Sequence, residues 1–437
     1  MGYIKSKLSA LKKEENFYLI MKIFTGAFPI QILGLIFSYI ISIFISRTFG
    51  AMGIGIFSLT NQIVTIFVLI SLLGSGLYIV KLVAESKSTN KLIDLNNKLV
   101  SLLIYIVLIG MFFTFILHLY SEDISKVLNN IQLSKPLKVA ALGIIPISII
   151  RYFSFAFNGK LQVVLSTFFK VFLVPSIILI MLGFSFVFEI QLELLTIFYF
   201  FILSNVVVGT LVIFVWFYQN PIKKLSLNLS NNLNKTFPFF IVSLSLFLYS
   251  SFNLFIIDYF IDTKNVGLFS IAFKLGSIIS LIHLVISKIF SPIIIKLIAE
   301  DNKYQLEKLL QKFSKNLFYL STLILIFFAV FGKSFLAIWG EEFIQSYNCL
   351  IIIVLAQLFN IITGYTGLLL INLGYEKLTS KIILLMLPFS LILSLLLIPK
   401  FGIIGASISF AICLTLENII KYIFVKRKLN ISTIKFL

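Results

Sequence analysis

The stretch Gly267–Glu300 reads GLFSIAFKLGSIISLIHLVISKIFSPIIIKLIAE, a long apolar segment that opens on a glycine and closes on charged residues. Half a chain earlier, Gly55–Glu85 reads GIFSLTNQIVTIFVLISLLGSGLYIVKLVAE, so GIFSL matches GLFSI and KLVAE matches KLIAE. A second pair joins FNGKLQVVLSTF, Phe157–Phe168, to INLGYEKLTSKI, Ile371–Ile382. Internal repeats indicate a duplicated architecture. Duplicated halves are common in transporters that rock one bundle against the other.

The composition excludes an ordinary soluble domain. Hydrophobic residues make up 59% of the chain and charged residues 12%, and the mean hydropathy is +1.08. The apolar residues form continuous runs, which are typical of membrane helices and not of the alternating strands of a β-barrel. The formal net charge of +19 is explained by lysines that anchor cytoplasmic loops and face anionic lipid. We therefore expect no nucleic-acid partner.

Twelve apolar runs are long enough to cross a membrane, since one crossing takes about 20 helical residues. They cover residues 22–46, 55–84, 98–119, 137–157, 162–187, 194–218, 237–261, 267–298, 316–339, 346–372, 379–398 and 402–425. The sequence therefore predicts an all-α integral membrane protein with about twelve spans.

The twelve spans divide into two halves at a polar segment bounded by prolines, NPIKKLSLNLSNNLNKTFP. We predict an N-terminal six-helix lobe over 1–219, a cytoplasmic inter-lobe linker over 220–236 and a C-terminal six-helix lobe over 237–437. With the N-terminus inside, the basic loop clusters fall on the cytoplasmic side, as the positive-inside rule requires. Both termini are therefore predicted to be cytoplasmic.

No motif of an enzyme is recognisable in the sequence. It contains no Walker A loop, no metal-ligand cluster and no nucleophile elbow. Cys349 and Cys413 lie in separate apolar runs and suggest neither a disulfide framework nor a metal site. We expect no catalytic residue, no cofactor and no metal.

Two lysines in the organising segment form part of a polar stripe. Lys274 and Lys288 are separated by about four helical turns, and Ser270 and Ser277 lie on the same side as Lys274. Ionisable residues in membrane helices usually face the bundle interior or water. We interpret Lys274 and Lys288 as cations of a functional cavity. The alternatives are snorkelling and, for Lys274, a structural ion pair with Asp258.

Arg151 and Lys170 belong to adjacent predicted helices on either side of a tight turn at 158–160. Each lies nine or ten residues from that turn, which places both about 15 Å along their helices. Two cations at one depth repel each other unless an anion lies between them. A bound phosphate would satisfy both, and arginine suits that geometry. The alternative is that one of them faces a lipid phosphate.

Three further charged residues lie in or near the predicted spans. Glu417 and Lys421 form an i,i+4 pair that neutralises itself, which favours a structural role, with ion coupling or gating by Glu417 as the alternative. Asp258 closes the span before the organising segment and is a second candidate for ion coupling or gating.

With the repeat, the spans and the charges in place, the chain resembles bacterial polysaccharide flippases. These Wzx-type O-antigen or capsule-unit translocases belong to the MOP superfamily, which also holds MATE drug exporters and lipid II flippases. In the first half the resemblance is carried by ISRTFGAMGIGIFSL and GSGLYIVKLVAE. In the second half it is carried by FIIDYFIDTKNVGLFSIAFKLGSIIS, FSPIIIKLIAE, IWGEEFIQSY, LINLGYEKL and LIPKFGIIGASIS.

The resemblance implies two pseudo-symmetric six-helix lobes around a cationic central cavity, with Arg47 and Asp258 near the outer mouth of the gap between the lobes. It also implies translocation of undecaprenyl-diphosphate-linked oligosaccharide, such as an O-antigen or capsule unit, from the inner to the outer leaflet of the bacterial cytoplasmic membrane. Its partners would be that lipid-linked oligosaccharide, membrane lipid and polysaccharide polymerase or assembly enzymes. Two alternatives remain open. A MATE-type exporter of cationic drugs would need an acidic cavity, and a non-transporting scaffold for glycan assembly would not need the polar stripe.

Overall fold

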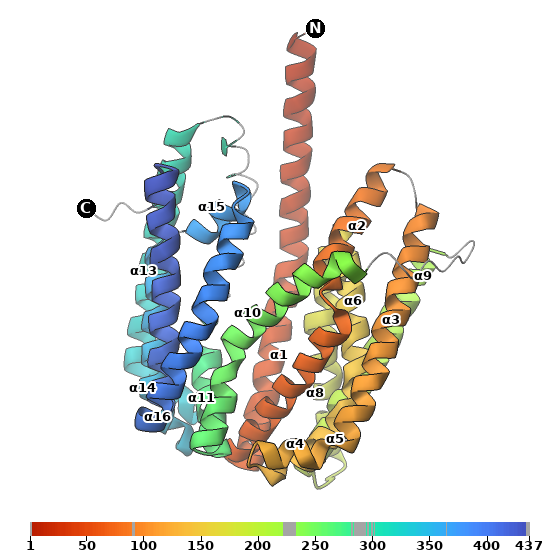
Figure 1. Ribbon diagram of the computed structural model, residues 1–437, viewed down its shortest axis with the longest axis vertical. Coiled ribbons are helices and arrows are strands. Elements are labelled where there is room, and N and C mark those ends of the chain that lie inside the picture. The colour runs from red at the N-terminus through yellow and green to blue at the C-terminus, as the bar shows by residue number, and fades with distance from the viewer. Residues whose placement is uncertain are drawn as a thin grey trace. The chain divides into compact units, whose positions relative to one another are not determined.

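The computed structural model describes residues 2–89, 92–221, 233–280, 302–363 and 365–433, together with residues 283, 294, 297, 298 and 300. Every regular element in these ranges is a helix (Figure 1). The chain divides into two compact units. The N-terminal unit consists of Gly26–Ser251 with Asp262–Gly267, and the C-terminal unit consists of Phe252–Ile261 and Leu268–Leu437 with Met1–Thr25.

The N-terminal unit is built from long helices joined by short turns. They are α1 (Gly2–Leu72) from Gly26 onward, α2 (Ser75–Thr89), α3 (Leu92–Leu119), α4 (Ser121–Val127), η1 (Ile131–Leu133), α5 (Ser134–Ala140), η2 (Ala141–Gly143), α6 (Ile144–Gly159), α7 (Val163–Thr167), η3 (Phe168–Leu173), α8 (Val174–Val187), α9 (Leu194–Gln219) and the first part of α10 (Leu233–Phe260). Of these, α6 packs against α2, α3 and α9.

The long helix α1 is broken at Gly50, where φ is 69° and ψ is −171°. Glycine adopts a positive φ at little cost because it has no Cβ. The break falls between the predicted spans 22–46 and 55–84, so α1 contains the first of them and the beginning of the second. A second break, at Leu73 and Gly74, separates α1 from α2.

Aromatic packing holds α6 against its neighbours. Phe153, Phe157 and Trp216 are fully buried, and the rings of Phe157 and Trp216 meet edge to face with centroids 5.2 Å apart. The hydroxyl of Tyr152 donates to the carbonyl of Leu99 on α3 over 2.6 Å. Close packing and interhelical hydrogen bonds of this kind associate helices in lipid, where little hydrophobic driving force remains.

The C-terminal unit contains the end of α10 together with α11 (Thr263–Gly276) from Leu268 onward, α13 (Lys303–Ala337), η4 (Glu341–Ser346), α14 (Tyr347–Ile362), α15 (Thr366–Asn372) and α16 (Glu376–Lys428). Helix α14 packs against both α13 and α16 (Figure 1). Helix α16 is broken at Gly402, the first residue of the predicted span 402–425, where φ is 61°.

Buried hydroxyl and amide groups link α16 to α10. The hydroxyl of Ser394 donates to Asn253 Oδ1 over 2.7 Å and lies 2.7 Å from the hydroxyl of Ser409. The first bond ties α16 to α10, and the second joins the two segments of α16, since Ser394 precedes the Gly402 break and Ser409 follows it.

The helical membrane fold is confirmed, whereas the number of spans stays a prediction. Among the described residues, eight helices are long and apolar enough to cross a membrane, or nine if the bent pair Phe239–Tyr249 and Ser251–Phe260 is one span. Two of the eight, Gly26–Leu72 and Lys377–Lys428, contain a glycine break, and each half is long enough for its own crossing. The predicted span 267–298 lies largely outside the described residues.

The predicted lobe boundaries also stay a prediction. Most of the expected linker, 220–236, lies outside the described residues, which end at 221 and resume at 233. The two compact units divide at Ser251 and Phe252, inside α10.

Candidate functional site

Helix α6 carries a half-buried arginine in its middle, at Arg151. Helix α6 packs against three other helices, and the Arg151 side chain is partly shielded from solvent. Among the residues that the structure describes, no acidic side chain forms an ion pair with it. A guanidinium at such a position is stabilised by water or by an anion.

Lys170 lies in the π-helical turn η3, between α7 and α8, and its side chain is exposed. Short π-helical segments are rare and are frequent at functional sites. The Lys170 ammonium lies 5.9 Å from the centroid of the Phe155 ring. Phe155 follows Arg151 by one helical turn and therefore projects from the same face of α6. The structure thus brings Lys170 to the face of α6 that carries Arg151.

The position of η3 depends on α1, because the two backbones approach very closely. A Cβ atom added at Gly34 would lie closer than 3.0 Å to the backbone carbonyl of Val171, the residue after Lys170. The rings of Phe37 and Phe172 continue the contact with centroids 5.5 Å apart. Glycine at position 34 is therefore required for the observed placement of the turn that carries Lys170.

Lys274 lies in the last turn of α11 and is half-buried. Ser270 precedes it by one turn on the same face, and the buried Ser270 hydroxyl has no hydrogen-bond partner among the described residues. Lys274 itself has a partner in the structure. The side chains of Lys288 and of the rest of the predicted stripe lie outside the described residues, so the stripe is seen only as far as Ser280.

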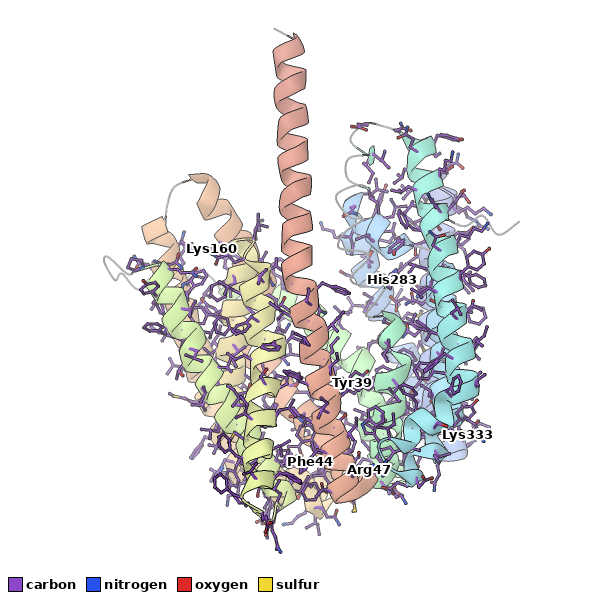
Figure 2. The ribbon with its side chains drawn as sticks, turned by 180° about the vertical axis from the view of Figure 1, so that it is seen from behind. Tyr39, Phe44, Arg47, Lys160, His283 and Lys333 are labelled. Atoms are coloured by element: carbon purple, nitrogen blue, oxygen red, sulfur yellow. The ribbon has the colours of Figure 1, made fainter. Side chains whose placement is uncertain are left out.

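The two residues expected near an outer mouth differ in burial. Arg47 is exposed at the end of the first segment of α1, one turn before the Gly50 break (Figure 2). Asp258 is buried near the C-terminal end of α10. Both residues have interaction partners in the structure, and their functional roles stay predictions.

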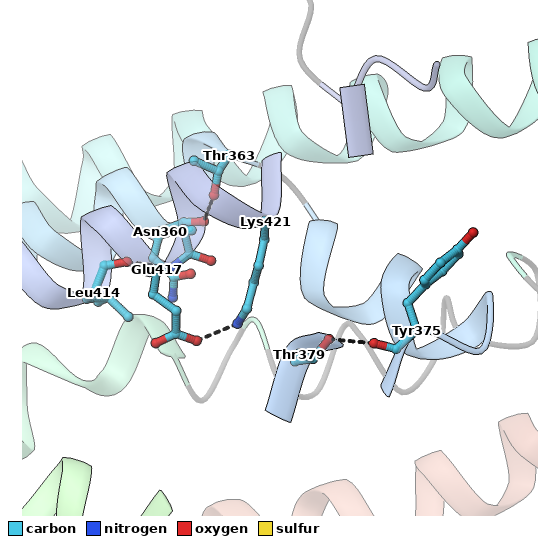
Figure 3. A network of polar contacts seen from close by, with 8 residues as sticks. Asn360, Thr363, Tyr375, Thr379, Leu414, Glu417 and Lys421 are labelled. Carbon is cyan, nitrogen blue, oxygen red and sulfur yellow. Dashed lines mark hydrogen bonds and ion pairs between the residues drawn. The ribbon is translucent and has the colours of Figure 1, made fainter. Parts of the chain in front are cut away.

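Glu417 and Lys421 form a buried ion pair on α16, with only 10% and 9% of their side chains exposed (Figure 3). The pair neutralises itself within one helical turn. Polar groups lie close by in the same unit: the Asn360 amide donates to Gln357 over 3.2 Å, and the Thr363 hydroxyl donates to the Asn360 carbonyl over 2.8 Å. This arrangement offers a self-contained polar region in the C-terminal unit.

His283, which is labelled in Figure 2, packs flat on Tyr365, with ring centroids 4.7 Å apart and ring planes 16° apart. The buried tyrosine ring occupies one face of the imidazole. The imidazole ring of His283 therefore contributes to packing within the C-terminal unit.

One largely buried polar cluster is not indicated by any pattern in the sequence. The Lys160 ammonium donates to Asn220 Oδ1 and lies 4.9 Å from the centroid of the Trp216 ring. The amide of Asn96 donates to the Asn220 carbonyl over 3.2 Å. The cluster joins the ends of α6 and α9 to α3, beside the predicted linker. No sequence pattern pairs Lys160 with Asn220, because sixty residues separate them.

Within the described ranges, no group of three His, Cys, Asp or Glu side chains is placed to hold a metal ion. Arg151 and Lys170 of the N-terminal unit are both cationic, and so is Lys274 of the C-terminal unit. Their chemistry suits binding of an anionic group by charge and hydrogen bonds.

Solved transporters share this fold. A multidrug resistance MATE family transporter of the MOP superfamily, in an inward-facing conformation, is similar with a TM-score of 0.73 over 95% of this chain and 98% of that chain, at 14% identity. A MOP superfamily transporter from Pyrococcus furiosus is similar with a TM-score of 0.68 over 96% of both chains, also at 14% identity. The chain thus has a helical membrane fold similar to that of MATE transporters.

The sequence assigns the chain to a particular family, whereas the fold assigns it only to a broad structural class. Residues 27–298 match the family of polysaccharide biosynthesis proteins, and this match covers more than half of the 437 residues. The chain belongs to this family. The resemblance to polysaccharide flippases is therefore confirmed.

Two relatives are similar over part of the chain. A capsular polysaccharide biosynthesis protein, CapF, from Staphylococcus aureus is 31% identical over 32% of this chain and 36% of its own length. A probable flippase, AglR, from Haloferax volcanii is 25% identical over 39% of this chain and 37% of its own length. The chain thus spans little more than a third of the curated relatives it matches.

Proposed function

We propose that the protein is a flippase that moves undecaprenyl-diphosphate-linked oligosaccharide, such as an O-antigen or capsule unit, from the inner to the outer leaflet by alternating access through a cationic cavity. The observation that carries the proposal is Arg151, half-buried in the middle of α6 with no acidic partner among the described residues. A cation held in this way needs an anionic ligand or water. The diphosphate of a lipid-linked glycan supplies the anion.

The named cations have distinct parts in this proposal. Arg151 and Lys170 bind the diphosphate, because a guanidinium and an ammonium approached from one face of α6 provide charge-assisted hydrogen bonds. Lys274, Lys288 and Arg47 contact the diphosphate or anionic sugars along the path. Asp258 and Glu417 are the candidates for ion coupling or gating. The prenyl chain stays in lipid during the transfer.

The proposal includes a cellular setting. The protein acts in the bacterial inner membrane with both termini in the cytoplasm, beside the polymerase or assembly enzymes that use the translocated unit. It performs no covalent chemistry and needs no cofactor, since translocation is a movement between leaflets. Removal of the product outside or an ion gradient gives the movement its direction.

The decisive experiment is a lipid extraction from cells that lack this gene. Undecaprenyl-diphosphate-linked oligosaccharide is quantified on the inner leaflet, alongside the surface polymer. We expect the lipid-linked oligosaccharide to accumulate and the polymer to be lost, and we expect the wild-type gene to reverse both. Normal polymer without accumulation would remove the proposal.

Substitution of the cavity cations tests the site within the same assay. Arg151→Ala and Lys274→Ala should each lower export about tenfold, since a hydrogen bond to a charged group contributes about 1.5–3 kcal/mol. Lys126→Ala is the matched control, because Lys126 is 66% exposed on α4, outside the predicted spans. Export that both cavity variants leave unchanged at normal expression would contradict the assignment.

A second candidate function is ion-coupled export of small molecules. The multidrug resistance MATE transporter with a TM-score of 0.73 favours it, since the two chains share a fold over nearly their whole length. Binding of a labelled cationic drug to the purified protein tests this candidate. Saturable drug binding, together with normal surface polymer in cells lacking the gene, would favour the exporter.

A further inference from the structure

A short segment at the start of α11, Asp262–Gly267, belongs to the N-terminal unit, although the residues before and after it belong to the C-terminal unit. Local hydrogen bonds within the segment define its conformation. Asp262 Oδ1 accepts hydrogen bonds from the backbone N–H of Asn265 over 2.6 Å and from its side-chain amide over 2.9 Å. An aspartate in this position caps a helix N-terminus, so the first turn of α11 has a defined conformation.

One buried hydrogen bond attaches this segment to the rest of the N-terminal unit. The Asn130 amide donates to the hydroxyl of Thr263 over 2.6 Å, and both side chains are buried. Asn130 lies in the turn between α4 and η1. A typical hydrogen bond contributes about 1 kcal/mol net, so this bond favours the attached position of the segment but can break reversibly.

The segment also crosses α1 through two glycines, one in each helix, that occupy equivalent positions of the internal repeat. A Cβ added at Gly55 would lie closer than 3.0 Å to atoms of Thr263, including its carbonyl oxygen, and one added at Gly267 would do the same at Ala51. Each glycine thus meets the carbonyl of the residue four positions before the other glycine. The two backbones therefore approach each other through equivalent positions.

These glycines begin the two copies of the internal repeat, GIFSL and GLFSI. The repeat consequently has a structural meaning: its copies meet at their first residues. Crossings of this kind are held by dispersion and weak contacts between backbones. They depend on the absence of a side chain and lose their contact when the helices separate by a small distance.

We propose that the crossing of Gly55 and Gly267, together with the Asn130–Thr263 hydrogen bond, is a releasable latch that closes the outer end of the transport path. The inference rests on the proposed alternating-access function, which requires one end of the path to be closed while the other is open. Release of Asp262–Gly267 from α1 opens the outer end. The contact that breaks and re-forms thus lies at the first residues of the two repeat copies.

A cysteine reporter in the latch tests this proposal in intact cells. Val266 is fully buried in the segment, and Val266→Cys preserves the Asn130–Thr263 bond. Its reaction with a membrane-impermeant maleimide measures how often the latch is open from outside. The native Cys349 and Cys413 are buried and set the background of labelling. Lys126→Cys, at an exposed position, reports equal delivery of the reagent.

The reporter is combined with Gly55→Ala and, separately, with Gly183→Ala. Gly183 is the matched control, because a Cβ added there meets no atom within 4 Å. We expect Gly55→Ala to raise the labelling rate of Val266→Cys about tenfold, which corresponds to about 1.4 kcal/mol of destabilisation of the latched state. Gly183→Ala should leave the rate unchanged, and Lys126→Cys should react equally in all backgrounds.

Two outcomes would overturn the latch. One is fast labelling of Val266→Cys already in the wild-type background, and the other is an equal effect of both alanine substitutions. A cross-link between Asn130→Cys and Thr263→Cys adds a second measurement: oxidation should stop transport and reductant should restore it. Transport that continues in the cross-linked protein would also contradict the latch. Since the labelling needs no substrate, failure of the flippase assignment leaves the labelling result unaffected.

Discussion

At the scale of single residues, substitutions in the buried pair of Glu417 and Lys421 can distinguish a structural role of the pair from a role in ion coupling. Both side chains are nearly inaccessible, so the charge of each is compensated by the other. Removing one partner leaves a buried charge without compensation, whereas removing both leaves none. The difference between the single and double variants is therefore informative.

We predict that Lys421→Met lowers the thermal stability of the purified protein, with a loss of about 3–5 kcal/mol in the free energy of unfolding. The double variant Glu417→Leu/Lys421→Met should recover most of that loss. The measurement is thermal unfolding in detergent. A double variant that is stable and transports normally assigns the pair to structure, and one that is stable but does not transport assigns it to coupling. Equal stability of the single variant and the wild type would contradict the burial argument.

At the scale of elements, the π-helical turn η3 presents Lys170 and is positioned by α1. Gly34 permits that contact, since any side chain at this position would collide with the Val171 carbonyl. No pattern in the sequence indicates this dependence, because a lone glycine in an apolar helix is common. It arises from the tertiary packing of α1 against η3.

We predict that Gly34→Ala lowers export and thermal stability, because α1 and η3 must separate to admit the methyl group. Gly183→Ala on α8 is the control, since it makes the same gain in helix propensity in open space. Export and thermal unfolding are measured for both variants. If Gly34→Ala exports as well as Gly183→Ala does, the placement of Lys170 does not depend on this contact.

At the scale of the whole molecule, the distribution of lysines predicts that both termini are cytoplasmic and that the number of spans is even. A reporter that is active only in the cytoplasm should be active when fused to either end of the chain. A reporter that is active only outside should be inactive at both ends. Activity of the outside reporter at one end would mean an odd number of spans, and its activity at the N-terminus would also remove the proposed outward position of Asp262–Gly267.

Much of the fold follows from the sequence alone. Membrane helices reveal themselves locally, because each crossing must supply about 20 apolar residues and satisfy its own backbone hydrogen bonds. For the same local reason, the predicted gap 47–54 contains the helix break at Gly50, and the predicted gap 399–401 directly precedes the break at Gly402. The repeated GIFSL and GLFSI segments and the cations Arg151, Lys170 and Lys274 were likewise readable as unusual residues in apolar runs.

The tertiary structure decided which of these features meet. It brought Lys170 to the Phe155 face of α6, paired Lys160 with Asn220 and set Gly55 and Gly267 against each other's helices. Hydrophobic periodicity does not contain this information, since helices in lipid are apolar on most sides and choose neighbours through small residues and shape. The sequence by itself determined a duplicated helical membrane protein with cations in its apolar runs, and close packing between distant segments decided which of these residues lie side by side.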